Sequence, residues 1–263
     1  MSHHVLITGA ASGIGAAIAD RFAADGRALS VVDLRAEQLG ATAERLRAAH
    51  RVPVTEIVGD LADAPFAEQL VDTAGQPDVL VNAAGIYPAT PLLEMTSHTW
   101  DRVQDVNVRA AMLSTVAFGR SCVAGGRRGA VVNISSGAAT RARPGAAHYA
   151  TSKAALEMLT KACAVELGPH RVRVNAVSPG FVTVHSAANP VTAEYAEAVS
   201  VNSLGRKGDP EDIARAVHWL AGESAEWITG AVLRVDGGAS AGTSALPLHW
   251  DGHTALQEGK EIP

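Results

Sequence analysis

A tyrosine, a lysine and a serine are spaced so that they could transfer a proton. Tyr149 and Lys153 stand four residues apart at the start of a segment with helical periodicity, which places phenol and ammonium on one face. A tyrosine with its ordinary pKa of about 10 is a poor base at neutral pH. A neighbouring ammonium favours the phenolate. We therefore expect Lys153 to lower the pKa of Tyr149 toward working pH, as general acid–base catalysis requires.

Ser136 precedes Tyr149 by 13 residues and follows an apolar run that is typical of a buried strand. In a parallel sheet, that end of the strand faces the crevice in which α/β proteins bind ligands. The Ser136 hydroxyl is therefore expected to share a substrate oxygen with Tyr149. The adjacent Ser135 is a competing candidate for this position.

A glycine-rich turn, with glycines at 9, 13 and 15, joins the first apolar run to a helical segment. Such a turn lets backbone N–H groups approach a pyrophosphate at the positive end of a helix. The next apolar run ends at Asp33, 18 residues beyond Gly15. A carboxylate there can accept hydrogen bonds from both ribose hydroxyls of an adenosine. A plain turn and a solvated acid are the alternatives, but the position in a βαβ unit favours a dinucleotide site.

Short apolar runs alternate with longer segments of helical periodicity along the whole chain. Runs this apolar are typical of parallel strands covered on both faces. The predicted strands are 5–8, 29–33, 54–59, 79–82, 130–135, 171–176 and 231–236. The predicted helices are 13–25, 36–50, 64–74, 99–124, 149–167 and 210–220. This order predicts an α/β fold of Rossmann type, with a doubly wound parallel seven-stranded sheet and helices on both faces.

One domain is expected to span residues 1–263, with two irregular parts. Residues 183–208 lack clear periodicity, and a stretch of that length is often a substrate loop or lid. Residues 239–263 form a C-terminal tail that contains an apolar cluster of Leu246, Leu248 and Trp250. Burial of this cluster against a neighbouring subunit would stabilise the assembly, whereas a frayed terminus is the alternative.

The composition excludes several classes of protein. The chain has 263 residues, of which 47% are hydrophobic and 19% charged, and this rules out disorder, collagen and a disulfide scaffold. The net charge of −5 gives no reason to expect nucleic acid or an anionic membrane as a partner. Cys122 and Cys163 have no metal-ligand spacing, so we expect no metal site, and two free thiols fit a reducing cytoplasm.

Seven motifs in order resemble the short-chain dehydrogenase/reductase family, in its single-domain branch, from Val5 to Gly238. They are the turn TGAASGIG at 8–15, Asp60-Leu61 after the third strand, NAAG at 82–85, the serine and YxxxK pair at 136–153, Ser178-Pro179-Gly180, Ile228-Thr229-Gly230 and VDGG at 235–238. The resemblance implies catalytic roles for Asn107, Ser136, Tyr149 and Lys153. It favours Ser136 over Ser135, and it links Asn107 to the lysine through water.

The same resemblance implies a set of cofactor-binding residues. They are Gly9, Ser12, Gly13, Ile14, Gly15, Asp33, Asp60, Leu61, Asn82, Ala83, Gly85, Tyr149, Lys153, Pro179, Gly180 and Val182. One position departs from the family pattern, because Val184 stands where a threonine that contacts the cofactor is usual. Either Thr183 replaces that threonine or the contact is missing.

The expected function is NAD-dependent interconversion of a secondary alcohol and a ketone, with hydride transfer to or from the nicotinamide. Asp33 would repel the 2′-phosphate of NADP. Family members that prefer NADP tend to carry a basic residue where Ser12 or Leu34 stands here, and Arg35 is expected to be solvated. An NADPH-preferring ketoreductase and a non-catalytic dinucleotide-binding regulator are the alternatives.

The predicted substrate pocket is largely apolar, which favours a neutral small-molecule alcohol or ketone. Arg141 and Arg143 are the reservation, since either could meet a substrate carboxylate, but we expect both to be solvated. The family resemblance also implies a homotetramer, in which the segments 99–124 and 149–167 pair across one two-fold axis.

Overall fold

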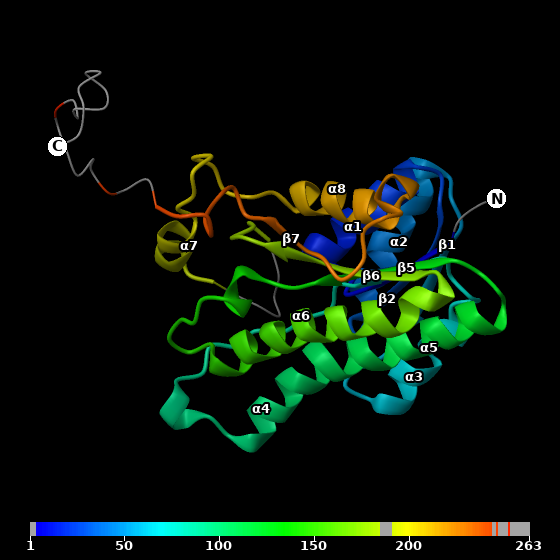
Figure 1. Ribbon diagram of the computed structural model, residues 1–263, viewed down its shortest axis with the longest axis horizontal. Coiled ribbons are helices and arrows are strands. Elements are labelled where there is room, and N and C mark those ends of the chain that lie inside the picture. The colour runs from blue at the N-terminus through cyan, green and yellow to red at the C-terminus, as the bar shows by residue number, and fades with distance from the viewer. Residues whose placement is uncertain (1–3, 185–190, 244–245, 247–251, 253–263) are drawn as a thin grey trace, which may run out of the picture.

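The computed structural model describes residues 4–184, 191–243, 246 and 252. Its centre is a parallel seven-stranded sheet with the strand order β3-β2-β1-β4-β5-β6-β7 (Figure 1). The strands are β1 (His4–Thr8), β2 (Ala28–Asp33), β3 (Val54–Val58), β4 (Val79–Asn82), β5 (Gly129–Ile134), β6 (Val172–Pro179) and β7 (Val232–Val235). The predicted Rossmann-type α/β fold is therefore confirmed.

Helices cover both faces of the sheet (Figure 1). One face carries α1 (Gly13–Ala24), α2 (Ala36–His50) and α8 (Pro210–Ala221), and the other α3 (Ala64–Thr73), α4 (Ser97–Gln104), α5 (Ala110–Ala124) and α6 (Ala147–Leu167). Along β1, Val5 and Ile7 pack into the first layer and Leu6 into the second. Because both faces of the strand are buried, its sequence is continuously apolar.

Three parts of the chain differ from the prediction. The expected helix 99–124 is α4 and α5 joined by a π turn, Asp105–Arg109. The strand β6 continues to Pro179, beyond the predicted end at 176. The irregular stretch 183–208 contains a helix, α7 (Ala193–Val199), whose N-cap Thr192 accepts a hydrogen bond from the Tyr195 amide. That helix is too short for its periodicity to show in the sequence. Single 3₁₀ turns lie at Leu92–Glu94, Gly137–Ala139, Gly168–His170 and Glu223–Ala225.

The crevice of the fold lies where β1 is flanked by β2 and β4. The strand order reverses there, because β2 and β3 follow on one side of β1 and β4 begins the other side. The Thr8 hydroxyl at the end of β1 accepts hydrogen bonds from the amides of Ala83 at 3.1 Å and Ala84 at 3.2 Å. The glycine turn after β1 is thereby joined to the NAAG turn after β4. These two turns form the floor of the candidate site.

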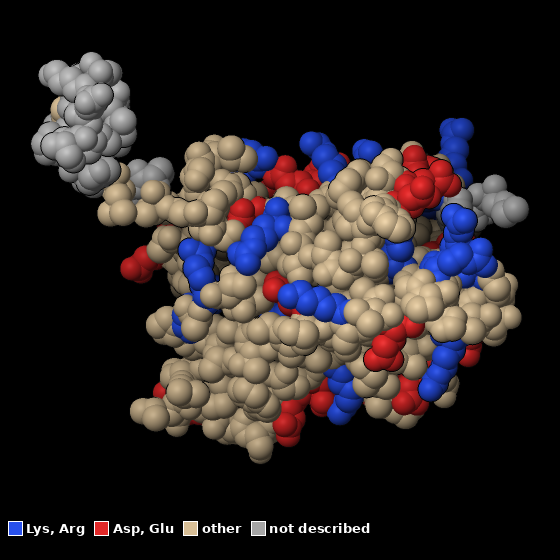
Figure 2. Space-filling model, in the orientation of Figure 1, with Lys and Arg blue, Asp and Glu red and all other residues tan. Residues whose placement is uncertain are grey.

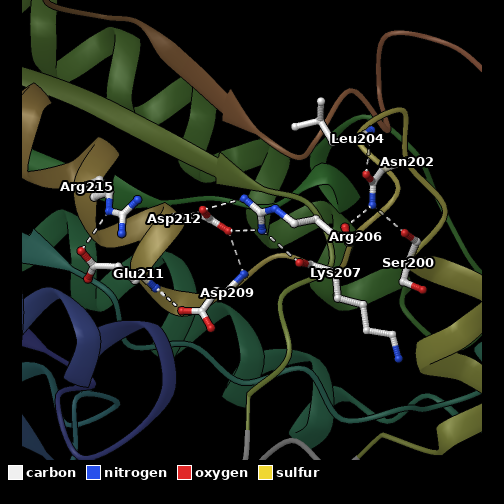
Figure 3. Close-up of polar contacts among 9 residues, drawn as sticks. All are labelled: Ser200, Asn202, Leu204, Arg206, Lys207, Asp209, Glu211, Asp212 and Arg215. Atoms are coloured by element: carbon white, nitrogen blue, oxygen red, sulfur yellow. Dashed lines mark hydrogen bonds and ion pairs between the residues drawn. The ribbon is translucent and has the colours of Figure 1, made fainter.

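The two ends of the stretch 183–208 are anchored. Val182 and Gly208 pair as a parallel β-bridge, and the Thr183 amide donates to the Gly208 carbonyl at 3.1 Å. Figure 3 shows how the chain then enters α8. Arg206 binds both carboxylate oxygens of Asp212 at 2.6 and 2.9 Å, and Asp212 also accepts from the Asp209 amide at 2.9 Å. With Asp209 as N-cap, this forms a capping box.

The predicted tail lies mostly outside the described residues, which include only 239–243, 246 and 252 of it. Leu246 is exposed, and the positions of Leu248 and Trp250 are not described. In the described part of the chain, no helix has the length and apolarity needed to cross a membrane. On the face drawn in Figure 2, basic and acidic side chains are interspersed, and a broad area over α4 and the adjoining part of α6 carries few charges.

Asp212→Ala should lower the free energy of unfolding by about 1 kcal/mol, because the variant loses its half of the capping box. Arg206 holds the pKa of Asp212 at about 2. A carboxylate whose pKa is lowered on folding stabilises the fold most at pH values above its unfolded pKa of 3.8. The loss in the free energy of unfolding of the variant should therefore shrink as the pH falls toward 2. Urea unfolding at several pH values measures both effects. Glu211→Ala is the matched control, because it removes only an exposed pair with Arg215. Equal losses in the two variants would contradict the prediction.

Candidate active site

The phenol of Tyr149 meets the hydroxyl of Ser136 at the carboxyl edge of the sheet. Ser136 follows β5, and Tyr149 lies in the first turn of α6. The Ser136 hydroxyl lies near enough to the phenol to oppose the rise in its pKa, and the Ser136 oxygen accepts a hydrogen bond from the Ala138 amide at 3.1 Å. The adjacent Ser135 is turned away and donates to Glu157 at 2.8 Å. The structure therefore places Ser136, not Ser135, beside the tyrosine.

Lys153 lies one helical turn after Tyr149, and its side chain is almost completely buried. Its ammonium donates a 2.8 Å hydrogen bond to the carbonyl of Ile134, the last residue of β5. The ammonium nitrogen is 5.7 Å from the centroid of the Tyr149 ring. The spacing in the sequence thus places phenol and ammonium on one side of α6.

Asn107 approaches Lys153 across a gap that Gly85 leaves open. Its carboxamide accepts from the Ile86 amide at 2.9 Å and donates to the Ile86 carbonyl at 2.9 Å and the Ser152 hydroxyl at 3.0 Å. A Cβ on Gly85 would lie 3.3 Å from the lysine nitrogen and 3.5 Å from the asparagine Oδ1. Asn107 lies in the π turn, a distortion that is frequent at functional sites. Four side chains from three parts of the chain therefore converge: the π turn, the end of β5 and α6.

Burial shifts the pKa values of the lysine and the tyrosine in opposite directions. It lowers the pKa of Lys153 to about 8, because the ammonium loses hydration. It raises the pKa of Tyr149, and the nearby Ser136 hydroxyl and the charge of Arg143 oppose this less strongly. The expected net lowering of the tyrosine pKa is therefore wrong for the chain itself, since burial of the phenol outweighs the nearby charges.

The glycine turn fits the backbone of a bound dinucleotide. Gly9 has φ +69°, and a Cβ there would lie 2.7 Å from the Ala84 Cα. A Cβ on Gly15 would lie 2.1 Å from the Gly9 carbonyl oxygen. Ser12, the N-cap of α1, makes no side-chain hydrogen bond to the helix amides. The first turn of α1 therefore offers N–H groups to an anion at the positive end of the helix, with Gly13 and Ile14 among them.

Asp33 ends β2 beside this turn, and Arg35 is bound to it. One oxygen of the buried carboxylate accepts from the Ala11 amide at 3.1 Å, and the other from the Arg35 amide at 3.1 Å and its Nε at 3.2 Å. The same guanidinium donates to the Ser12 hydroxyl at 2.9 Å. The expectation that Arg35 is solvated is therefore wrong. Its guanidinium joins Asp33 to Ser12.

The remaining residues that were expected to bind the cofactor between the third and fourth strands differ in what their side chains do. Burial alone would raise the pKa of Asp60, but hydrogen bonds from Arg102 at 2.9 Å and the Ala62 amide at 2.9 Å lower it. Leu61 is buried next to it. Asn82 donates to Asn133 at 2.9 Å and accepts from Ser114, so its carboxamide is engaged inside the protein. The backbone amides of Ala83 and Ala84, also in the NAAG turn, are both held by the Thr8 hydroxyl.

The strand β6 delivers Pro179 and Gly180 to the opposite side of the crevice. Gly180 donates to Val235 at 3.0 Å, and a Cβ on it would lie 2.8 Å from the Asp236 Cα. Beyond Val182, Thr183 is exposed, whereas the Val184 side chain lies 3.3 Å from the position of a Cβ on Gly13. The Val184 side chain thus faces the glycine turn, and the exposed Thr183 does not take the place of the usual threonine at that turn.

Aromatic and basic side chains line the approach to Tyr149. The Tyr87 ring packs at 5.3 Å and 50° to the Tyr149 ring. The guanidinium carbon of Arg143 lies 5.9 Å from the centroid of the Tyr149 ring and 5.0 Å from that of Tyr195 in α7. Arg143 is half-buried, contrary to the expectation that it is solvated. His148, the residue before Tyr149, is completely buried.

Arg35 and Arg143 were both expected to be solvated, and each instead contacts residues of the site. One signal for each was present in the sequence. Arg35 directly precedes α2, so its side chain starts next to the end of β2. Arg143 lies between Ser136 and Tyr149, in a segment whose two ends must meet. No cluster of three or more His, Cys, Asp or Glu that could hold a metal is present within residues 4–184 and 191–243.

Proteins of similar sequence and fold are known. A family profile described as enoyl-(acyl carrier protein) reductase matches residues 9–240. A (3R)-3-hydroxyacyl-CoA dehydrogenase from Mus musculus is 38% identical over 249 residues, which cover 89% of this chain and 94% of that protein. A solved structure titled short chain dehydrogenase/reductase family protein is 35% identical, with a TM-score of 0.82 over 92% of this chain and 100% of the other.

Two further solved structures are in complex with different nicotinamide cofactors. A blue fluorescent protein from a metagenomic library, in complex with NADPH, is 36% identical with a TM-score of 0.82, over 90% of this chain and 98% of the other. A 4-hydroxyisoleucine dehydrogenase complexed with NADH is 30% identical with a TM-score of 0.79, over 92% of this chain and 100% of the other. The motifs, the sheet order and these matches show that the chain belongs to the short-chain dehydrogenase/reductase family.

Proposed function

We propose that this protein is an oxidoreductase that interconverts a secondary alcohol and a ketone with NAD(H). The observation that carries the proposal is the convergence of Asn107, Ser136, Tyr149 and Lys153 beside a turn that fits a dinucleotide. A non-catalytic regulator would need the turn but not this set of proton-handling groups. The bound dinucleotide would supply the hydride acceptor or donor.

Each of the four residues has a separate part in the proposed mechanism. Ser136 holds the substrate oxygen next to the phenol, and Tyr149 removes its proton in oxidation or returns one in reduction. Burial raises the pKa of Tyr149, so the free enzyme carries a protonated phenol, which is the form that serves reduction. Lys153 places a cation behind the phenol, and Asn107 faces it across the gap at Gly85.

The cofactor would be held by residues at the carboxyl edge of the sheet. The turn at 9–15 would bind the pyrophosphate, Asp33 the adenosine ribose, and Asp60 and Leu61 the adenine side. Ala83, Gly85, Pro179, Gly180 and Val182 would line the remainder, and Lys153 and Tyr149 the nicotinamide ribose. NAD(H) is preferred over NADP(H) in this proposal, because Asp33 stands at the ribose and repels a 2′-phosphate.

We further propose a cytoplasmic homotetramer. Apolar side chains are exposed on α5 and α6 (Val123, Met158 and Val165) and near β7 (Trp219 and Trp227, the latter 96% exposed). Large apolar groups in such positions gain by burial against a second copy. Cys122 and Cys163 are both free thiols, which fits a reducing compartment.

Tyr149→Phe should lower kcat by about a hundred- to ten-thousandfold, because it removes the group that exchanges a proton with the substrate oxygen. The measurement is NADH formation with a panel of secondary alcohols. Titration with NADH should give a nearly unchanged Kd, and Ser135→Ala serves as the control for a nearby hydroxyl outside the set. A variant that retains the wild-type kcat would rule out the assigned role.

Asp33→Ala should shift the ratio of kcat/KM for NADH over NADPH toward NADPH by about tenfold to hundredfold. The variant removes the repelling carboxylate and leaves the Arg35 guanidinium beside Ser12, where it can meet a phosphate. Arg35→Ala is the paired variant and should shift the ratio of kcat/KM toward NADH. A wild-type enzyme that uses both cofactors equally would refute the NAD preference and favour the ketoreductase alternative.

In the Lys153→Met variant, the free energy of unfolding should no longer show the dependence on pH that the buried lysine contributes. The pKa of Lys153 is about 8 in the fold against 10.5 in the unfolded chain. Between these values the unfolded chain binds one more proton, so raising the pH favours the folded wild type. The difference in free energy of unfolding between wild type and variant should therefore move in favour of wild type from pH 8 to 10.5. Chemical denaturation across that range tests it, and a constant difference contradicts it.

A further inference from the structure

The guanidinium of Arg143 stands at the mouth of the site between the catalytic ring and the substrate loop. It lies over Tyr149 of α6 and over Tyr195 of α7, at 5.9 and 5.0 Å from the ring centroids. It is thus the cation that contacts both the residue that handles the proton and the helix of the stretch 183–208. A side chain in this place meets whatever binds next to the phenol.

Arg143 has no anionic partner among the residues that the structure describes. Other half-buried arginines of the chain do have acceptors: Arg127 pairs with Asp78, and Arg173 donates to four backbone carbonyls. Contact with two aromatic rings stabilises the charge but uses none of the five N–H donors. The hydroxyl of Tyr195 beside it is also enclosed without a hydrogen-bond partner in the described part of the chain.

We propose that Arg143 binds a carboxylate of the substrate, so that the enzyme acts on a hydroxy acid or its keto acid. A guanidinium is a planar fork that matches a carboxylate in a bidentate pair. Because it lies against the Tyr149 ring, the carboxylate must be within a few bonds of the carbon that reacts. A charge at the far end of a long substrate would lie away from this position. The inference rests on the oxidoreductase function proposed above, and it replaces the expectation of a neutral substrate.

The test compares acids with their esters. The probes are 2-, 3- and 4-hydroxy fatty acids of short chain and their methyl esters, with NAD⁺ as the oxidant and NADH absorbance as the readout. Wild-type kcat/KM should be at least about tenfold higher for one acid than for its ester, as one charge-assisted pair provides. Arg143→Gln should lose about tenfold to hundredfold more activity on that acid than on its ester. Arg143→Lys, which retains charge without the fork, should fall between them.

Arg141→Gln is the matched control, because Arg141 lies in the same segment and is exposed. It should behave as wild type on every probe. Equal wild-type rates on acids and esters would overturn the proposal. An equal loss on both in Arg143→Gln would also overturn it, since Arg143 would then only hold the loop.

A binding measurement separates this inference from the proposed function. The acids should raise the Tm of the NAD⁺-saturated enzyme, and Arg143→Gln should abolish that rise while Arg141→Gln retains it. A rise of this kind without turnover supports the carboxylate site and counts against the oxidoreductase. Tyr149-dependent turnover of the esters alone supports the oxidoreductase and overturns the carboxylate site. No rise in Tm with any of the acids overturns it as well.

Discussion

The hydrogen bond from the Lys153 ammonium to the carbonyl that ends β5 connects the chemistry to the scaffold. Removing an ammonium from water is costly unless it is paired, so this bond fixes where the first turns of α6 can lie against the sheet. Tyr149 stands one turn earlier on the same helix, and its distance from the end of β5 follows from that constraint. Ser136, two residues after the bonded carbonyl, is then brought to the phenol by the chain itself.

A chain of buried amides behind the site keeps this arrangement rigid. The Ser114 hydroxyl donates to Asn82, Asn82 to Asn133 and Asn133 to Thr160, each at 2.9 Å. These bonds connect α5, β4, β5 and α6 in one line. A buried polar network in which each member is satisfied holds its elements in one relative position. Asn82 therefore contributes to the site through the architecture, in addition to any contact of its backbone.

The sequence predicts the strands and the longer helices better than it predicts the partners of charged side chains. Apolar runs identified all seven strands, because strands buried on both faces leave a continuous signal, and the spacing of Tyr149 and Lys153 indicated a shared helix face. The π turn around Asn107 was not predictable, since its extra residue leaves the apolar pattern of α4 and α5 nearly unbroken. The α7 helix was missed because so short a segment shows no period. Arg35 and Arg143 were misplaced, because a charged side chain in a loop reveals its partners only when the chain around it is folded.

The bridge between Val182 and Gly208 has a consequence for how this enzyme can change over evolutionary time. The two ends of the intervening segment are fixed side by side, whatever its length or composition. The entropy lost on closing such a loop increases only slowly with the number of residues in it. Exchange or lengthening of this one segment therefore leaves the sheet, the glycine turn and the tyrosine undisturbed. Variation in this segment can therefore alter what lies beside Arg143 and Tyr149 without rebuilding the elements that position them.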